Sequence, residues 1–243
     1  MAIRFSRTTR SWFTVVEIEM NSLCNQRCTY CPVSILPVPD VPKNMSDDVF
    51  NKLLDELCQI DFSGKISYHF YNEPLLRHDL EKYIAQVKDT LPNAFQLLFT
   101  NGTLLTEERY NSLLKAGIDH FLVTRHDFAP MPERPWQTVE FPNDLIVSNR
   151  GGTMYQLKEP LNLPCFVPNE SLIVTVTGEI LLCCDDAQRK IIMGDLKKQS
   201  IEEIWFSDKF IEIRELLKKG RRDTASSICR HCSNKEYFIP GKA

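Results

Sequence analysis

The sequence lacks the features that would tie it to a membrane or to a nucleic acid. No apolar run approaches the roughly 18 residues of a membrane-spanning helix, and the basic start, residues 1–10, has no apolar core of a secretory signal. Lysine and arginine form no block, and the formal net charge is −3, so no nucleic-acid partner is expected. We therefore expect a cytoplasmic protein that binds neither membrane nor nucleic acid.

Cysteine, in contrast, is plentiful. Nine cysteines in 243 residues, without a secretion signal, predict metal binding or catalysis in a reducing compartment rather than disulfide bonds. The odd number suits two metal centres with cysteines to spare. Hydrophobic residues make up 43% of the chain, which is enough for one large domain or for a core domain with a small appendage.

Three of the cysteines lie on one short stretch. Cys24, Cys28 and Cys31 have the spacing C-x₃-C-x₂-C. Three thiolates on one loop can hold three irons of a [4Fe–4S] cube, which leaves the fourth iron open to a small molecule. A zinc knuckle is the alternative, but zinc sites use four ligands in closely spaced pairs, and no fourth ligand lies nearby in the sequence.

The first half of the sequence alternates predicted strands and helices. Strands are expected at 14–20, 65–71, 95–100 and 120–125, and helices after the N-cap Ser46, at 79–91 and at 107–115 with Gly117 as a stop signal. This alternation predicts an α/β fold of parallel βαβ units. Only four or five units fit, which excludes a closed eightfold barrel. The three-cysteine loop follows the first strand, at the end where such barrels place their chemistry. Cys58, on the first helix, is expected in the core.

The pattern changes after about residue 128. A proline-rich segment, 128–142, predicts an irregular crossing, and 144–148 predicts a last strand. Residues 172–177 and 179–183 predict a hairpin around Gly178. Further on, Ser200 opens a capping box, and a helix from Ser207 ends at Gly220.

Four cysteines of this second half, Cys165, Cys183, Cys229 and Cys232, are candidates for a second metal centre. Their spacing alone also fits a structural zinc, or a site in which His231 replaces a thiolate. We favour a second [4Fe–4S] cluster, because the first set already commits the protein to iron–sulfur chemistry.

The C-x₃-C-x₂-C motif resembles the signature of the radical S-adenosylmethionine (SAM) superfamily. The stretch from Gly194 to Trp205 before the final C-x₂-C resembles members of that superfamily with a C-terminal SPASM or "twitch" domain. The resemblance implies a partial (β/α) barrel over residues 1–152 and a small hairpin-and-helix auxiliary-cluster domain over residues 153–243. It also implies two [4Fe–4S] clusters and SAM, which the open iron binds and which is cleaved to methionine and a 5′-deoxyadenosyl radical.

The same resemblance implies which residues hold SAM. Tyr30 is expected near the adenine, and Asn72-Glu73 stands where the family has Gly-Glu, a motif that holds the SAM amino group. Asn101 is expected to touch the ribose or the carboxylate. Arg125 ends a predicted strand on the same rim.

Longer motifs, among them residues 69–76 and 148–152, resemble radical SAM dehydrogenases that oxidise a secondary alcohol of an aminocyclitol to a ketone. This implies a small-molecule substrate held by Glu17, Tyr71, Phe99 and Arg150, and an external electron donor of the flavodoxin or ferredoxin type. Arginine keeps its proton, because its pKa lies above about 12. Arg150 is therefore expected to orient the alcohol and to stabilise charge, not to remove a proton.

Three alternatives stay open from the sequence. Cys184 follows a cluster ligand, and a free thiol there could give a hydrogen atom to a substrate radical, as in an epimerase. A peptide-modifying maturase is a second alternative, although the first strand begins by about residue 14 and leaves no visible leader-recognition domain. An iron–sulfur carrier without enzyme activity is the third, but it gives Glu73 and Asn101 no role.

Overall fold

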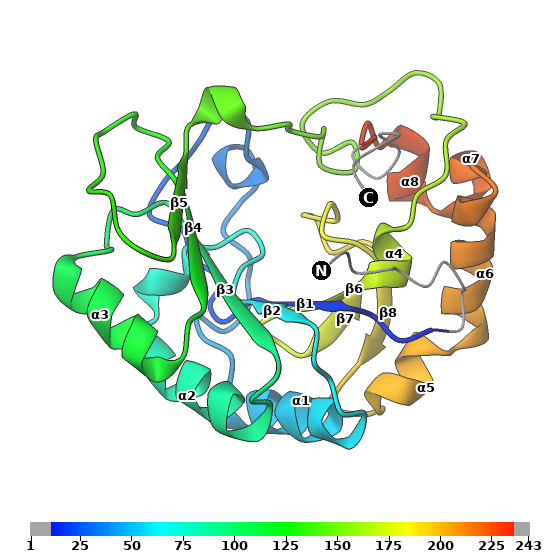
Figure 1. Cartoon of the computed structure of the whole chain (residues 1–243). Helices are drawn as coiled ribbons and strands as arrows, with labels where there is room; N and C mark the ends of the chain where they lie inside the picture. Colours follow the sequence, from blue (N-terminus) through cyan, green and yellow to red (C-terminus); the bar gives the residue numbers. More distant parts are fainter. Residues whose placement is uncertain (1–10, 236–243) are drawn as a thin grey trace.

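The computed structural model describes residues 11–235, which build around one sheet of eight strands (Figure 1). The strand order is β5-β4-β3-β2-β1-β6-β7-β8. The strands are β1 (Val15–Ile18), β2 (Lys65–Ser67), β3 (Phe95–Thr100), β4 (His120–Thr124), β5 (Gln137–Glu140), β6 (Ser171–Val174), β7 (Glu179–Leu181) and β8 (Ile192–Asp195). Neighbours from β5 through β6 are parallel, and β6-β7-β8 is antiparallel. The predicted partial α/β barrel with a C-terminal hairpin is confirmed.

The helices lie in two groups (Figure 1). Along the outer side of the first strands run α1 (Asp47–Gln59), α2 (Leu80–Thr90) and α3 (Glu107–Ala116). Beside β6–β8 lie α4 (Val167–Glu170), α5 (Ile201–Trp205), α6 (Asp208–Lys218), α7 (Arg222–Ala225) and α8 (Ser227–His231). The predicted N-caps are confirmed, because Ser46 accepts a hydrogen bond from the N–H of Val49 and Ser200 forms a capping box with Glu203.

Three local predictions are wrong. The segment 128–142 contains a strand, β5, which pairs with β4. Residues 144–148 form no strand: Pro142–Asp144 is a 3-10 turn in which the Asp144 carboxylate accepts from the N–H of Phe141, and the backbone that follows is irregular. Cys58 is exposed rather than buried, because the buried side of the last turn of α1 is formed by Glu56 and Leu57.

Strand β1 lies in the middle of the sheet and separates two environments. Val16, Ile18 and Met20 are fully buried against the core, whereas Glu17 and Glu19 point to the opposite face because side chains alternate along a strand. β1 pairs with β6 in parallel, so the sheet continues across the predicted domain boundary at residue 152. The boundary itself stays a prediction. No helix within residues 11–235 has the length and apolar character needed to cross a bilayer.

Candidate active site

The three-cysteine loop is held against the carboxyl ends of β2 and β3. The N–H of Glu73 donates to the carbonyl of Leu23 (2.8 Å), and Asn21 Nδ2 donates to the carbonyl of Glu73 (2.9 Å). Asn101 Nδ2 donates to Asn25 Oδ1 (2.8 Å), one residue after Cys24. Asn101 therefore positions the loop from the end of β3, and its amide oxygen is already used by Thr103.

The Glu73 carboxylate is 2% exposed and joins the ends of two strands. It accepts from Thr100 Oγ1 (2.7 Å), the N–H of Asn101 (2.8 Å) and the N–H of Leu75 (3.0 Å). Burial raises the pKa of this carboxyl, against the effect of those hydrogen bonds. Its neighbour Asn72 has a buried Nδ2 without a hydrogen-bond partner among the described residues. An orphaned donor at this rim suits a polar cofactor such as SAM.

Tyr30 and Arg125 belong to the same rim. The Tyr30 hydroxyl hydrogen-bonds His126 Nδ1, which ties the cysteine loop to the end of β4. Arg125 pairs with Asp127 (2.8 Å), and its buried Nε has no partner among residues 11–235. Contacts of Glu73, Asn101 and His126 with the loop thus place Tyr30, Glu73 and Asn101 at one rim, where Asn72 and Arg125 are chain neighbours of Glu73 and His126.

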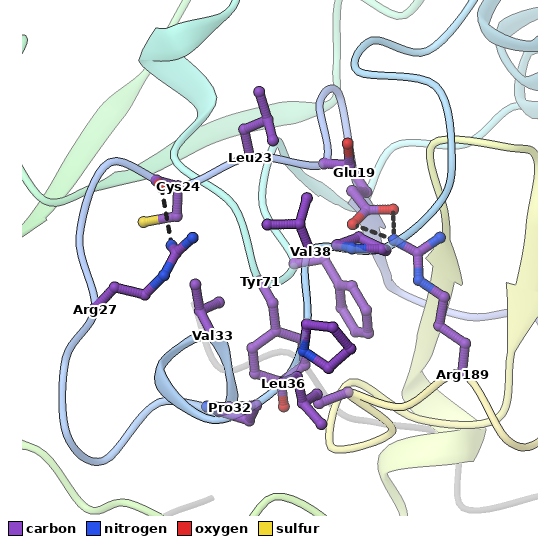
Figure 2. Close-up of a pocket in the computed structure, with 15 residues that line it drawn as sticks. Glu19, Leu23, Cys24, Arg27, Pro32, Val33, Leu36, Val38, Tyr71 and Arg189 are labelled. Atoms are coloured by element: carbon purple, nitrogen blue, oxygen red, sulfur yellow. Dashed lines mark hydrogen bonds and ion pairs between the residues drawn. The ribbon is translucent and has the colours of Figure 1, made fainter.

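A pocket of about 560 Å³ opens on the other side of this loop (Figure 2). Cys24 and Arg27 line one end, Tyr71 lies in its wall, and the ion pair of Glu19 with Arg189 lines the other end. Arg189 NH2 lies 2.7 and 2.9 Å from the two carboxylate oxygens of Glu19, which is 2% exposed. This pair fastens the loop after Cys184 to the end of β1.

The second set of cysteines faces one cavity, lined by Cys165, Cys183, Cys229 and Cys232. His231 instead hydrogen-bonds the carbonyl of Leu157 and does not line it. Four thiols around one space fit a [4Fe–4S] cluster. In residues 11–235, no three His, Cys, Asp or Glu side chains are close enough to hold a single metal ion.

Burial keeps these thiols protonated until a metal binds. It raises the pKa of Cys229 to about 12 and that of Cys28 to about 11. A metal that binds either set would therefore have to displace protons, since the thiolate is the ligand.

Between the two cysteine sets the structure gathers the predicted substrate residues. The Tyr71 hydroxyl donates to the carbonyl of Cys184 (3.0 Å), and the Arg150 guanidinium lies 6.0 Å from the Tyr71 ring centroid. Glu17 Oε2 lies 4.0 Å from His69 Nε2, and the His69 ring lies 4.0 Å from that of Phe99. Glu17, from β1, thus faces His69, which follows β2 and packs on Phe99 of β3.

Arg150 lies in a turn, residues 149–152, that packs against two segments of the second cysteine set. Residues 150, 151 and 152 have φ of 52°, 59° and 85°, a conformation that favours glycine. A Cβ on Gly151 would meet the carbonyl oxygen of Asp185 at 2.8 Å, and one on Gly152 would meet His231 at 2.7 Å. Asn149, which is fully buried, donates to the carbonyl of His231 (2.6 Å). The backbone at Arg150 is therefore held by the contacts of Asn149, Gly151 and Gly152 with Asp185 and His231.

Two residues of the site were not singled out from the sequence, His69 and Asp185. Asp185 is 2% exposed; it accepts from Ser148 Oγ (2.7 Å) and Asn234 Nδ2 (2.9 Å), and it lies 3.6 Å from Arg150 NH1. An acid directly after the Cys183-Cys184 pair was the available signal. This signal does not reveal which residues Asp185 contacts, because its partners Ser148 and Asn234 lie 37 and 49 residues away in the chain.

Electrostatics separates the roles of these groups. Burial raises the pKa of Glu17 to about 7; Asp185 adds to this rise, and Lys65 and Arg150 oppose it. Burial, with Lys65 and Arg150, lowers the pKa of His69 to about 3. Burial would lower the pKa of Arg150, but Tyr71, Asp185 and nearby thiols outweigh it and raise the pKa. Near neutral pH, Glu17 can exchange a proton, His69 is uncharged and Arg150 stays cationic.

Comparison with known proteins agrees with this arrangement. The family model of the Radical SAM superfamily matches residues 18–136, and that of the SPASM iron-sulfur cluster-binding domain matches residues 165–233. The S-adenosyl-L-methionine-dependent 2-deoxy-scyllo-inosamine dehydrogenase of Niallia circulans is 36% identical over 235 residues, 91% of this chain and 93% of that protein. A PqqA peptide cyclase of Bradyrhizobium diazoefficiens is 31% identical over 112 residues, 45% of this chain and 27% of that one.

Among solved structures, that of BtrN in complex with AdoMet and 2-DOIA matches with a TM-score of 0.84 and 35% identity, covering 92% of this chain and 94% of that chain. BtrN in an open conformation matches with a TM-score of 0.78 and 33% identity, covering 93% and 94%. The likeness to the dehydrogenase thus spans nearly the whole chain, whereas that to the peptide cyclase spans less than half.

Proposed function

Because the chain belongs to the radical SAM superfamily, as an enzyme that uses SAM and iron–sulfur clusters, we propose that it oxidises a secondary alcohol of an aminocyclitol to a ketone. The observation that carries this proposal is the 36% identity to a 2-deoxy-scyllo-inosamine dehydrogenase over 91% of the chain. Peptide modification is not favoured, because the peptide cyclase covers less than half of this chain.

When bound, SAM with its cluster would supply hydrogen-atom abstraction at the carbinol carbon, and the auxiliary cluster would supply a one-electron oxidant for the resulting radical. The protein must then accept the hydroxyl proton. Arg150 is unsuited to this, because it is already protonated and its pKa is raised. Glu17, with a pKa of about 7, is the group able to accept a proton near neutrality.

We assign the other residues by their place around this reaction. Arg150 orients the alcohol oxygen and stabilises negative charge on it, and Tyr71 and Phe99 line the substrate pocket. Cys24, Cys28 and Cys31 hold the SAM cluster, and Cys165, Cys183, Cys229 and Cys232 hold the auxiliary cluster. The side chains assigned to the SAM site are Tyr30, Asn72, Glu73, Asn101 and Arg125.

Cys184 is not needed for this reaction, and the epimerase alternative is not favoured because the relative of nearly full length is a dehydrogenase.

We further propose a reduced flavodoxin or ferredoxin as electron donor. All nine cysteines are free, which suits a reducing compartment, and we propose the cytoplasm. Functionally, residues 1–152 would serve SAM and residues 153–243 the auxiliary cluster.

The test is anaerobic reconstitution with iron and sulfide, followed by incubation with SAM, a reductant and 2-deoxy-scyllo-inosamine in deuterated water. We expect 5′-deoxyadenosine together with a product two hydrogens lighter than the substrate. A product of unchanged formula that has gained deuterium at carbon would establish epimerisation instead. Absence of 5′-deoxyadenosine would overturn the proposal.

A further inference from the structure

We infer that His69 is a substrate-binding residue that acts with Glu17 on a second polar substituent of the ring, a hydroxyl or an amino group apart from the alcohol being oxidised. The inference rests on the proposed function and adds a specificity contact to the same site.

The sheet places His69 beside the groups that matter. Ser67, the last residue of β2, is the partner of Glu17 on β1 and of Leu97 on β3. Two residues further along, His69 and Phe99 lie side by side, with ring centroids 4.0 Å apart and planes tilted by 34°. The imidazole is therefore held by ring contact from β3 rather than by hydrogen bonds.

Among the described residues, neither ring nitrogen of His69 makes a hydrogen bond. Nδ1 is buried and has no partner within residues 11–235, and Nε2 lies 4.0 Å from Glu17 Oε2, beyond hydrogen-bond distance. Three other histidines differ: His120 bonds Thr138, His126 bonds Tyr30, and His231 bonds a backbone carbonyl. A buried polar atom left without a partner is costly, so an unsatisfied imidazole beside a carboxylate indicates a missing ligand group.

The gap between His69 and Glu17 fits one ligand atom. Consider a ligand oxygen or nitrogen about 2.8 Å from both Nε2 and Oε2. The angle at that atom between Nε2 and Oε2 would be about 90°, close to the hydrogen-bonding geometry of a hydroxyl or an amine. Such a bridge occupies one carboxylate oxygen and leaves Oε1 of Glu17 for the alcohol proton.

The charges around the gap favour a neutral imidazole. Lys65 from β2 and Arg150 from the turn at 148–152 are cations that face it, Asp185 from the auxiliary loop is the nearby anion, and Glu17 lies across the gap. A neutral imidazole has one donor and one acceptor nitrogen. While Glu17 accepts, the imidazole can therefore accept from an amine, which has more than one N–H, or donate to a hydroxyl.

The test uses three variants that separate the two ring nitrogens. His69→Phe keeps the ring contact with Phe99 and removes both nitrogens, His69→Gln places an amide near Nε2, and His69→Asn places one near Nδ1. Binding of 2-deoxy-scyllo-inosamine is measured by calorimetry on reconstituted, SAM-loaded enzyme that has not been reduced, so that no turnover occurs. Iron content and SAM affinity of each variant serve as the folding control.

We expect His69→Phe to weaken binding and to raise KM by about 10- to 100-fold, with kcat changed by less than about threefold, because a ground-state contact is lost. His69→Gln should recover most of the affinity and His69→Asn should not. Ring analogues in which a single hydroxyl or the amino group is missing identify the contacted substituent: the variant should lose the wild type's discrimination against one of them.

The inference and the function fail in different ways. If the wild type forms ketone while His69→Phe binds the substrate as tightly as the wild type, the inference is overturned and the function stands. Equal losses in His69→Gln and His69→Asn would also overturn the inference, because a contact through Nε2 would then be excluded. If the wild type forms no ketone at all, the proposed function fails, whatever the variants bind.

Discussion

The two cysteine sites are built in different ways. The cysteines that we propose for the SAM cluster, Cys24, Cys28 and Cys31, lie within eight residues on one half-buried loop. Hydrogen bonds to neighbouring strand ends hold this loop in place. The four cysteines that we propose for the auxiliary cluster come from separate segments between Cys165 and Cys232 and are more deeply enclosed. The first site depends on one loop, whereas the second exists only once β6, β7 and α8 have assembled. The substrate residues lie where the two sites meet.

The largest expected effect separates the two sites by their products. Cys28→Ala should abolish 5′-deoxyadenosine formation, because the SAM cluster loses a ligand. Cys229→Ala should abolish the ketone but leave 5′-deoxyadenosine formation, because the SAM loop does not depend on that segment. Chromatography of both products, with iron analysis of each anaerobically purified variant, makes the measurement. Loss of 5′-deoxyadenosine in Cys229→Ala, with iron still bound, would contradict the independence of the two sites.

Glu17, which lies between the two cysteine sites, should control the pH dependence of ketone formation. With its pKa raised to about 7 by burial, the carboxyl is protonated below that pH and cannot accept the alcohol proton. In the wild type, kcat/KM for ketone formation should rise with pH through about 7. Glu17→Gln should remove this rise and lower the rate by about 10²- to 10⁴-fold, the usual loss for a general base.

The raised pKa of Glu17 also makes the stability of the folded protein depend on pH. The folded protein holds the Glu17 proton between pH 4.5, the ordinary value, and about 7. The stabilisation is therefore full below pH 4.5 and is lost as pH rises through 7, by at most about 3 kcal/mol. Urea unfolding of wild type and Glu17→Gln at pH 5 and pH 8 checks the sign: the variant should lose less stability than the wild type between these two pH values.

For the kinetic prediction, a kcat/KM for ketone formation that does not change with pH in the wild type would show that Glu17 is not the base.

Arg189 fastens the auxiliary loop to β1, and its loss should be the next largest effect. Arg189→Ala leaves the Glu19 carboxylate, 2% exposed, with the N–H of Val176 but without its cation. Breaking one side of a buried ion pair costs about 3 kcal/mol. Lys198→Ala is the matched control, because Lys198 pairs with Asp195 at 3.2 Å while 77% exposed, and should cost less than about 1 kcal/mol. Urea midpoints of the reconstituted proteins decide; equal midpoints would show that the loop is held by other contacts.

Local signals in the sequence predicted the fold well. Ser46, the Ser200–Glu203 capping box and the turn at Gly178 act within four residues, and each is confirmed. β5 was missed, because a short strand in a proline-rich segment is defined by its partner β4. For the site, spacing located both cysteine sets, and the resemblance to the family supplied Glu17 and Arg150. His69 and Asp185 were missed because their importance depends on which strand ends meet, which no local pattern contains.

The smallest effects concern the two cysteines that belong to neither set. Cys184→Ala should keep ketone formation and gain no deuterium at carbon, because its thiol has no part in the oxidation and lies outside the cavity of the auxiliary cluster. Cys58→Ala is the matched control: Cys58 is exposed on α1, and surface substitutions change stability by about 0.5 kcal/mol or less. Both variants should bind as much iron as the wild type. Loss of ketone in Cys184→Ala alone, with iron unchanged, would show that the Cys184 thiol takes part in the reaction and belongs to the active site.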